Sequence, residues 1–226
     1  PAARLRWFPA SRSGALFLAG CLALGSVLRL MDVGPALLFG DELHSLRDMH
    51  GGYPQILTHF SQTGGGLALP LLQRIAFDLF GDGHWSIRAP AWLGGLGLLF
   101  LAFPITRRHL GEPAALATAA VVAVLPLLVF YSHFARIYSL VALLCLLLYD
   151  RLERATRSAD WTRRDAAKLV ALTALLPWLH PTALGFVVPV YAGALLACGL
   201  EPGRSVGEFR QVGRRLVGAL ALAGLL

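Results

Sequence analysis

Charged residues are scarce in this sequence. Only 15% of its 226 residues are charged, whereas ordinary soluble domains carry about a quarter. Hydrophobic residues make up 56% of the chain, and the mean hydropathy is +0.63. A soluble fold of this size has too little interior for so much apolar surface, but a lipid bilayer accommodates it. The composition therefore excludes an ordinary soluble domain and favours an integral membrane protein.

Several familiar catalytic and metal-binding motifs are missing as well. The three cysteines lie in apolar runs without CxxC or Cys/His spacing, so we interpret them as buried free thiols (Cys21, Cys145 and Cys198). The sequence contains no G-x-S-x-G nucleophile motif and no Walker phosphate-binding loop. Nothing here indicates a zinc site, a serine hydrolase or a P-loop nucleotide-binding enzyme.

Basic residues outnumber acidic ones, with a net charge of +7 and a pI near 10.0. Nucleic-acid surfaces present basic residues on one face, interleaved with aromatics. Here the basic residues form short clusters between apolar runs, which is where membrane-topology signals lie. We therefore expect no nucleic-acid partner.

The apolar runs predict an all-α, polytopic transmembrane helix bundle with residues 1–226 as a single transmembrane domain. About 20 apolar residues are needed to cross a bilayer. Six spans are predicted: Gly14–Met31, Ser86–Thr106, Pro113–Tyr131, Tyr138–Tyr149, Ala166–Leu179 and Thr182–Gly199. A seventh begins near Leu216. Since the chain starts without methionine and ends inside an apolar run, we expect a longer protein truncated at its C-terminus.

The distribution of lysine and arginine predicts the orientation. With the N-terminus in the cytoplasm, 15 of the 20 basic residues fall in cytoplasmic segments, as the positive-inside tendency requires. The N-terminus is therefore predicted to be cytoplasmic, and the location that we expect is the inner (cytoplasmic) membrane.

One connection, residues 32–85, is far longer than the others and is predicted to be the first extracytoplasmic loop. Within it, Leu67–Phe80 sets Gln73, Arg74 and Asp78 against a broad apolar surface. This pattern is typical of a helix lying in the membrane interface. The run Gly64-Gly65-Gly66 is expected to give that helix a flexible entry.

The first candidate site is Asp41-Glu42, because paired acids beside a membrane are costly unless they are solvated or functional. If a helix runs from Asp41 through His50, one face carries Asp41, His44, Ser45 and Asp48. Two carboxylates and an imidazole suit deprotonation of a hydroxyl or coordination of a divalent cation. The alternative is that Asp41 is the N-cap of an interfacial helix whose dipole Glu42 complements.

The second candidate site joins the third and fourth spans on the same outer face. Arg136 lies there between Tyr131 and Tyr138 and is suited to gripping a phosphate. The alternative is an aromatic belt with a single snorkelling arginine. If the site is real, Asp41 and Arg136 should converge on one outer-facing cavity that is continuous with lipid.

The third candidate is His180, followed by Pro181, at the outer end of the fifth span. A structural role for a histidine beside a helix-ending proline is the alternative.

The order of these features resembles the GT-C glycosyltransferases, in particular the protein-mannosyltransferase and aminoarabinose-transferase branch (glycosyltransferase family 39-like). The specific parts are Asp41-Glu42 after the first span and the run Ala135-Arg136-Ile137-Tyr138-Ser139. Phe80-Gly81 and Arg88-Ala89-Pro90 follow the same order. The resemblance extends from about Leu16 to Pro189.

The resemblance implies a polyprenyl-phosphate-linked sugar donor used on the periplasmic or luminal face. It implies that Asp41 is the general base or a carboxylate that orients the acceptor, that Glu42 supports it, and that Arg136 and Tyr138 lie near the donor phosphate or in the wall of the site. His180 matches a polar position of such proteins. Relatives often carry a His-Pro-Pro-like turn where this chain has Gly64-Gly65-Gly66, which puts that histidine's role in doubt.

The hypothesis is therefore a cell-envelope glycosyltransferase that moves a sugar to an acceptor hydroxyl with inversion, the acceptor being a glycan, lipid or protein. Asp41 and Glu42 are its catalytic candidates, and His44 joins the substrate-binding candidates Arg136, Tyr138 and His180. A divalent metal ion is a possible cofactor. The alternative is a non-catalytic membrane protein, such as a lipid-linked-sugar carrier or an assembly subunit.

Overall fold

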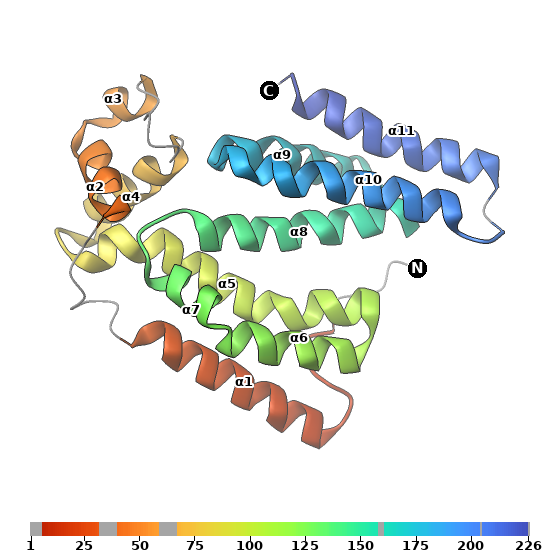
Figure 1. The fold of residues 1–226 in the computed structure, drawn as a ribbon, viewed down its shortest axis with the longest axis horizontal. Coiled ribbons are helices and arrows are strands. Elements are labelled where there is room, and N and C mark those ends of the chain that lie inside the picture. Colours follow the sequence, from red (N-terminus) through yellow and green to blue (C-terminus); the bar gives the residue numbers. More distant parts are fainter. Residues whose placement is uncertain (1–5, 32–39, 59–66, 158–160, 204, 226) are drawn as a thin grey trace. The chain divides into compact units, whose positions relative to one another are not determined.

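The computed structural model describes residues 6–31, 40–58, 67–157, 161–203 and 205–225, and these residues form helices without any strand (Figure 1). The predicted all-α class is therefore confirmed. The chain divides into an N-terminal unit, Arg4–Leu143, and a C-terminal unit built mainly of Leu144–Leu226.

In the N-terminal unit, α1 (Arg12–Leu30), α5 (His84–Leu110) and α6 (Glu112–Val124) pack along one another. A group of further helices lies at one end. The short helices α2, α3 and α4 lie where α5 begins (Figure 1). The elements are α1 (Arg12–Leu30), α2 (Asp41–His50), α3 (Tyr53–Thr58), α4 (Ala68–Phe80), α5 (His84–Leu110), α6 (Glu112–Val124), α7 (Pro126–His133) and the first turns of α8 (Tyr138–Arg157).

The packing of α1, α5 and α6 follows from small residues on α6. Ala115 and Ala119 are fully buried against Leu18 and Phe103, so the three helices share one apolar core. A sharp reversal joins α5 to α6 at Gly111, whose φ of 85° lies in the left-handed region that favours glycine.

The predicted third span is broken in two. Helices α6 and α7 are bent by 53° at Leu125-Pro126. Proline has no backbone N–H and its ring clashes with the preceding turn, so it kinks or breaks a helix, and here it breaks the span. The other prolines predicted within spans, Pro104, Pro177 and Pro189, lie inside continuous helices.

The helix predicted over Leu67–Phe80 is present as α4 (Ala68–Phe80), and its place in the membrane interface stays a prediction. Its buried face includes Gln73, whose side chain is fully enclosed. The expectation that Gln73 shares a polar face with Arg74 and Asp78 is therefore wrong, because its amide is used inside the protein. The predicted glycine entry, residues 64–66, lies outside the described residues, as does the first part of the loop.

The C-terminal unit consists of the rest of α8 with α9 (Arg163–Leu179), η1 (Pro181–Ala183), α10 (Leu184–Leu200) and α11 (Val206–Ala223). Thr162 and Asp165 form a reciprocal capping box at the start of α9. Inside the unit, a 2.6 Å hydrogen bond joins the hydroxyls of Thr173 and Tyr191.

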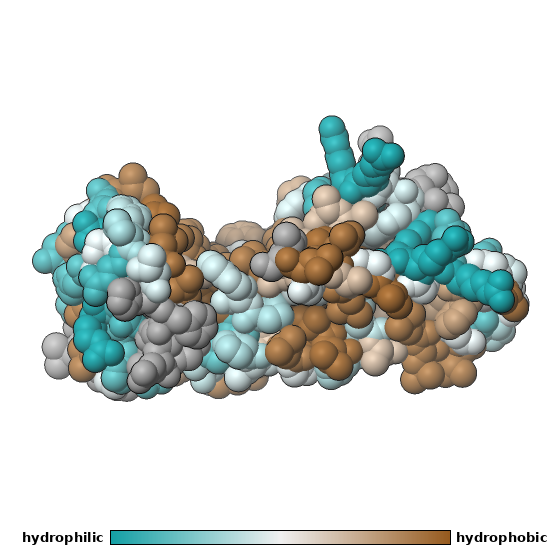
Figure 2. All heavy atoms as spheres, turned by 90° about the horizontal axis from the view of Figure 1, so that it is seen from above, coloured by the Kyte–Doolittle hydropathy of each residue, from teal (hydrophilic) through white to brown (hydrophobic). Residues whose placement is uncertain are grey.

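Three described helices are long and apolar enough to cross a membrane: α1, α5 and the segment Pro181–Leu200. The bent pair α6–α7 makes a fourth if it is one span. The protein is thus a polytopic membrane protein. Helices α8, α9 and α11 are present where spans were predicted, but their membrane crossing stays a prediction. Figure 2 shows hydrophilic residues gathered over the α2–α4 end of the N-terminal unit.

Candidate active site

Helix α2 presents the first candidate residues. It runs from Asp41 to His50, as the sequence predicted. Gly40 precedes it with a φ of 54° and is the N-cap, without a side-chain capping bond. The alternative that Asp41 is the N-cap is therefore wrong. Asp41 and Glu42 instead occupy the first turn, where their charges complement the helix dipole.

Glu42 points into the protein and forms a buried ion pair with Arg88 in the first turns of α5. The Arg88 Nε lies 3.2 Å from Glu42 Oε1, and Nη2 lies 3.3 Å from Oε2. Both side chains are almost completely buried. This two-pronged arrangement fixes the orientation of both groups, because a planar guanidinium matches a carboxylate edge to edge.

Glu42 also holds the segment that leads to the second candidate site. The backbone N–H of Ala135 donates a 2.7 Å hydrogen bond to Glu42 Oε1. Beside it, the Gln73 amide donates to the carbonyl oxygens of Ile87 at 2.9 Å and of Ala135 at 3.4 Å. Ile87 and Ala135 pack with Met49 in a small apolar core. Helices α2, α4 and α5 thus fix the backbone at Ala135.

Arg136 and Asp41 meet at this end of the unit, although they are 95 residues apart. Arg136 Nη1 donates to the Asp41 carbonyl oxygen at 3.4 Å, and Nη2 lies 4.0 Å from Asp41 Oδ2. The Arg136 side chain is only 6% exposed, whereas that of Asp41 is 60% exposed. The snorkelling alternative does not describe Arg136, which is enclosed. The predicted convergence is present; the lipid-continuous cavity stays a prediction.

Aromatic rings surround the Arg136 segment. The rings of Tyr131 and Tyr138 lie 4.8 Å apart, and those of Phe130 and Phe134 stack at 5.2 Å. Tyr138 therefore lies in an aromatic cluster next to Arg136. Such a wall has apolar faces and polar hydroxyl edges, which suits the boundary between a lipid and its head group.

Two glycines in α5 allow the site segment to approach closely. A Cβ atom on Gly94 would lie 2.6 Å from the backbone nitrogen of Leu140, and one on Gly95 would collide with Ser132. In addition, Ser139 Oγ donates a 2.5 Å hydrogen bond to the Ala91 carbonyl. The backbone on both sides of Arg136 is thus fitted against α5.

The remaining predicted members of the α2 face lie apart from this contact network. His44 is exposed and Asp48 is half-buried, with an Arg47 Nε 3.8 Å from its carboxylate. The side chain of Ser45 lies outside the described set. Among described residues, no three His, Cys, Asp or Glu side chains form a group able to hold a metal ion. A divalent metal therefore stays a hypothesis without an evident ligand set.

A polar cluster joins α3 to α4 at this end of the unit. The Tyr53 hydroxyl donates to Asp78 Oδ2 at 2.7 Å, and Arg74 Nη2 lies 3.0 Å from Asp78 Oδ1. These hydrogen bonds lower the pKa of Asp78 below its ordinary value, and the same bond to Asp78 raises the pKa of Tyr53. The cluster ties the short helix α3 to α4.

His180 belongs to the C-terminal unit and is described within that unit. It is the N-cap of η1, and its Nδ1 lies 2.7 Å from the Thr182 hydroxyl and accepts from the Thr182 N–H at 3.3 Å. These contacts support a local structural role. Its substrate-binding role stays a prediction.

Arg88 and Gln73 contact residues of the candidate site, although they were not among the sequence-based candidates. Arg88 had one detectable signal, since an arginine in the first turns of an apolar span requires a buried partner. Its pairing with Glu42 rather than Asp41 depends on how α2 packs. The position of Gln73 beside the charged Arg74 predicted a polar side chain at the surface, but the Gln73 side chain is buried.

Comparison with known proteins identifies the family. Residues 65–197, more than half of the chain, match the family model described as dolichyl-phosphate-mannose-protein mannosyltransferase. The matched region includes Arg88, Arg136, Tyr138 and His180, whereas Asp41 precedes it. No curated protein and no solved structure shows a significant match. The chain therefore belongs to the dolichyl-phosphate-mannose-protein mannosyltransferase family and is a membrane glycosyltransferase of the GT-C type.

Proposed function

We propose that this glycosyltransferase moves a sugar from a polyprenyl-phosphate carrier to an acceptor hydroxyl on the outer face of the membrane, inverting the anomeric carbon. The observation that supports this most directly is the meeting of Asp41 and Arg136. A carboxylate and a guanidinium 4.0 Å apart can contact the two ends of one reacting group. The family suggests a lipid-linked donor.

Asp41 is the proposed general base. Its carboxylate is the most exposed of the site's charged groups described above, so an approaching acceptor can reach it. In the reaction the acceptor oxygen bonds to the anomeric carbon while the bond from that carbon to the phosphate oxygen breaks. The acceptor proton passes to Asp41, and the carrier leaves as polyprenyl phosphate. Attack opposite to the leaving group inverts the anomeric carbon.

Arg136 is the proposed phosphate-binding residue. The leaving phosphate gains negative charge in the transition state, and a guanidinium in an enclosed position stabilises it more strongly than in water. The rings of Tyr131 and Tyr138 form the adjacent wall, and we place the carrier head group against them. Glu42 is buried and paired with Arg88, so we assign it support of the site rather than proton transfer.

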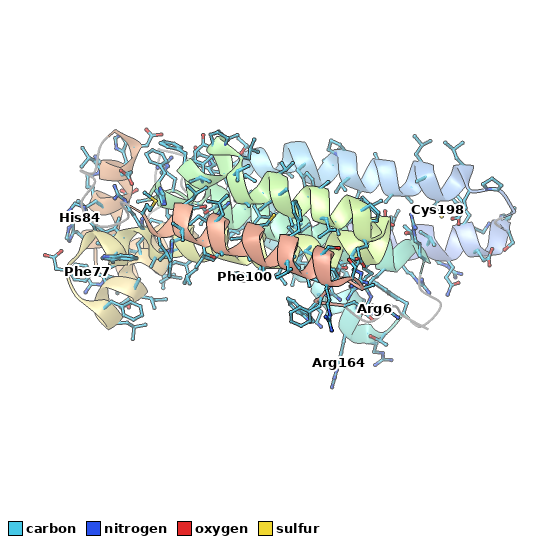
Figure 3. All side chains as sticks on the ribbon, turned by 90° about the horizontal axis from the view of Figure 1, so that it is seen from below. Arg6, Phe77, His84, Phe100, Arg164 and Cys198 are labelled. Atoms are coloured by element: carbon cyan, nitrogen blue, oxygen red, sulfur yellow. The ribbon has the colours of Figure 1, made fainter. Side chains whose placement is uncertain are left out.

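The orientation is proposed from the distribution of charge along the N-terminal unit. Phe77 and His84 lie at the end formed by α2–α4, and Arg6 lies at the opposite end of α1 (Figure 3). Arg107 and Arg108 share that opposite end, in the last turn of α5. Because basic residues favour the cytoplasmic side, we place the α2–α4 end, including the loop 32–85, on the outer face.

The test is transfer in vitro by the full-length protein, with a panel of polyprenyl-phosphate sugars and separated acceptor classes. Asp41→Asn should lower kcat by about 10²–10⁴-fold, since it removes a positioned base. Asp82→Asn, which changes an exposed acid between α4 and α5, is the matched control and should keep full activity.

Full activity of a correctly inserted Asp41→Asn protein would rule out the assignment of the base. If no sugar is transferred from any member of the panel by the wild type, the polyprenyl-phosphate proposal fails. In that case a non-catalytic carrier role becomes the better hypothesis.

A further inference from the structure

Arg29 is a completely buried arginine in the last turn of α1, a helix apolar enough to cross the membrane. Its guanidinium does not extend to the surface. Nη2 donates to the Val122 carbonyl at 2.7 Å, and Nη1 donates to the carbonyls of Ala123 at 3.2 Å and Gly25 at 2.9 Å. A buried charge in a span is costly unless it is paired or hydrogen-bonded, so this placement requires a structural reason.

Two of the three carbonyl oxygens that Arg29 contacts, those of Val122 and Ala123, are exposed by the break in the third span. In a continuous helix the Val122 oxygen would accept from the N–H of residue 126, but that residue is Pro126. Ala123 would accept from Leu127, which lies beyond the 53° bend. Arg29 therefore supplies the donors that the broken helix lacks. Such freed groups in a membrane require a partner.

Helices α1 and α6 pack closely beside the contacts of Arg29. A Cβ atom on Gly25 would lie 3.0 Å from the Ala123 Cα and 2.9 Å from Leu99 Cδ1. The backbone of α1 thus touches the last turn of α6 one helical turn before Arg29. This close approach brings the guanidinium to the break.

The break sets the direction of α7, which leads into the candidate active site. Ser132 on α7 packs against Gly95 of α5, and the next residues include Ala135 and Arg136, the contacts of Glu42 and Asp41. We propose that Arg29 is a positioning residue: by binding the Val122 and Ala123 carbonyls it stabilises the bend that carries Arg136 to Asp41. The positioning of Arg136 for catalysis rests on the proposed function, whereas the coupling of Arg29 to Pro126 does not.

The first experiment measures the coupling between Arg29 and Pro126 through the thermal stability of the full chain in detergent. Arg29→Met should lower the Tm strongly, because it leaves the Val122 carbonyl without a donor. Arg29→Met in a Pro126→Ala background should lower it much less, since the introduced alanine supplies a backbone N–H to the Val122 carbonyl. Arg12→Met, at an exposed position on the same helix, is the control and should change little. Equal losses in the two backgrounds would overturn the proposal.

The second experiment measures positioning directly. Spin labels at Leu110 and Phe130, both exposed, report the distance from the end of α5 to α7 in a background without the three cysteines. Arg29→Met should shift or broaden this distance, and Arg29→Lys, which keeps a cationic donor, should restore part of it. An unchanged distance distribution in Arg29→Met would overturn the positioning role.

Transferase assays then separate this inference from the proposed function. Arg29→Met should lower kcat by about 10- to 100-fold with a smaller change in KM, as expected for a small displacement of a catalytic group. If the wild type transfers no sugar, the proposed function fails, and the stability and label measurements still decide the role of Arg29. If the wild type is active, and an Arg29→Met protein with a shifted label distance keeps full kcat, the positioning role fails.

Discussion

Glu42 and Arg88 show how one carboxylate of an acidic pair can be structural while its neighbour stays available for chemistry. Glu42 is enclosed, with both oxygens facing Arg88 and one also accepting from Ala135. Asp41, one residue earlier, is largely exposed. Because successive residues on a helix point about 100° apart, a single turn can present one acid to the interior and the other to substrate.

This pair makes a prediction about stability. Glu42→Gln should lower the stability by about 3–5 kcal/mol, since it removes the carboxylate that pairs with the buried Arg88. The control is Arg157→Gln, which breaks an ion pair on α8 whose arginine is 64% exposed and should cost about 0.2–1 kcal/mol. Thermal unfolding in detergent measures both. Similar small losses for the two variants would contradict a structural role for Glu42.

At the residue scale the sequence predicted that Asp41 and Arg136 meet, but it did not predict the partners of Glu42 and Gln73. Asp41 and Arg136 were identified as members of one site because the predicted topology places both on the outer face. Arg88 and Gln73 could not be assigned in the same way, because their partners depend on the packing of α2 and α4 against α5. The N-cap alternative for Asp41 failed for a local reason: Gly40 adopts the left-handed φ that begins the helix.

At the scale of elements, the close contact between α5 and the Arg136 segment depends on the absence of a side chain at Gly94. Gly94→Ala should therefore displace Leu140, whose backbone nitrogen would lie 2.6 Å from the new Cβ, and should reduce both activity and stability. We expect a stability loss of about 1–3 kcal/mol from this overpacking. Unfolding and transfer assays on the same preparation measure it.

The matched control for that variant is Gly20→Ala in α1, where an added Cβ meets nothing within 4 Å. It should be neutral or stabilising by about 0.5–1 kcal/mol, because alanine favours a helix over glycine. Equal effects of the two variants would show that helix propensity, rather than the contact with Leu140, governs the Gly94 result.

The start of α9 makes a prediction about pH. Burial alone would raise the pKa of Asp165, but hydrogen bonds from Thr162 and the charges of Arg154 and Arg151 lower it below its ordinary value. A carboxyl group with a lowered pKa in the folded state stabilises the fold above its unfolded pKa, about 3.9. That stabilisation is lost as the pH falls through the lower folded value.

Asp165→Asn should therefore reduce the Tm near neutral pH, with a difference from the wild type that shrinks as the solution is acidified below about pH 4. Unfolding curves across that range test it. A difference that is constant with pH would mean that the carboxylate charge does not contribute.

Element boundaries were predicted well where a strong local signal exists. The helix from Asp41 to His50 and the helix over residues 68–80 are present. The break at Pro126 was not predicted, since prolines in membrane helices are often tolerated, and Pro104, Pro177 and Pro189 lie in continuous helices. Pro126 differs from these prolines because Arg29, on another helix, donates hydrogen bonds to the carbonyl groups before the break. A local sequence pattern cannot predict a contact between two helices.

At the scale of the whole molecule, the topology can be tested by cysteine labelling in intact cells after replacement of the three native cysteines. A membrane-impermeant maleimide should label Asp82→Cys from outside, because Asp82 is exposed between α4 and α5. Arg163→Cys, at the exposed start of α9, should react only after permeabilisation. The opposite pattern would place loop 32–85 in the cytoplasm and remove the basis for an outer-face site.

The buried pairing of Glu42 also constrains how the protein is made. Glu42 precedes Arg88 by 46 residues and Ala135 by 93 residues, and synthesis proceeds from the N-terminus. During biogenesis the Glu42 carboxylate gains these partners only after the segments that carry Arg88 and Ala135 have been synthesised. The candidate site in the N-terminal unit is thus complete only after the ribosome has passed residue 135, and a shorter nascent chain lacks part of it.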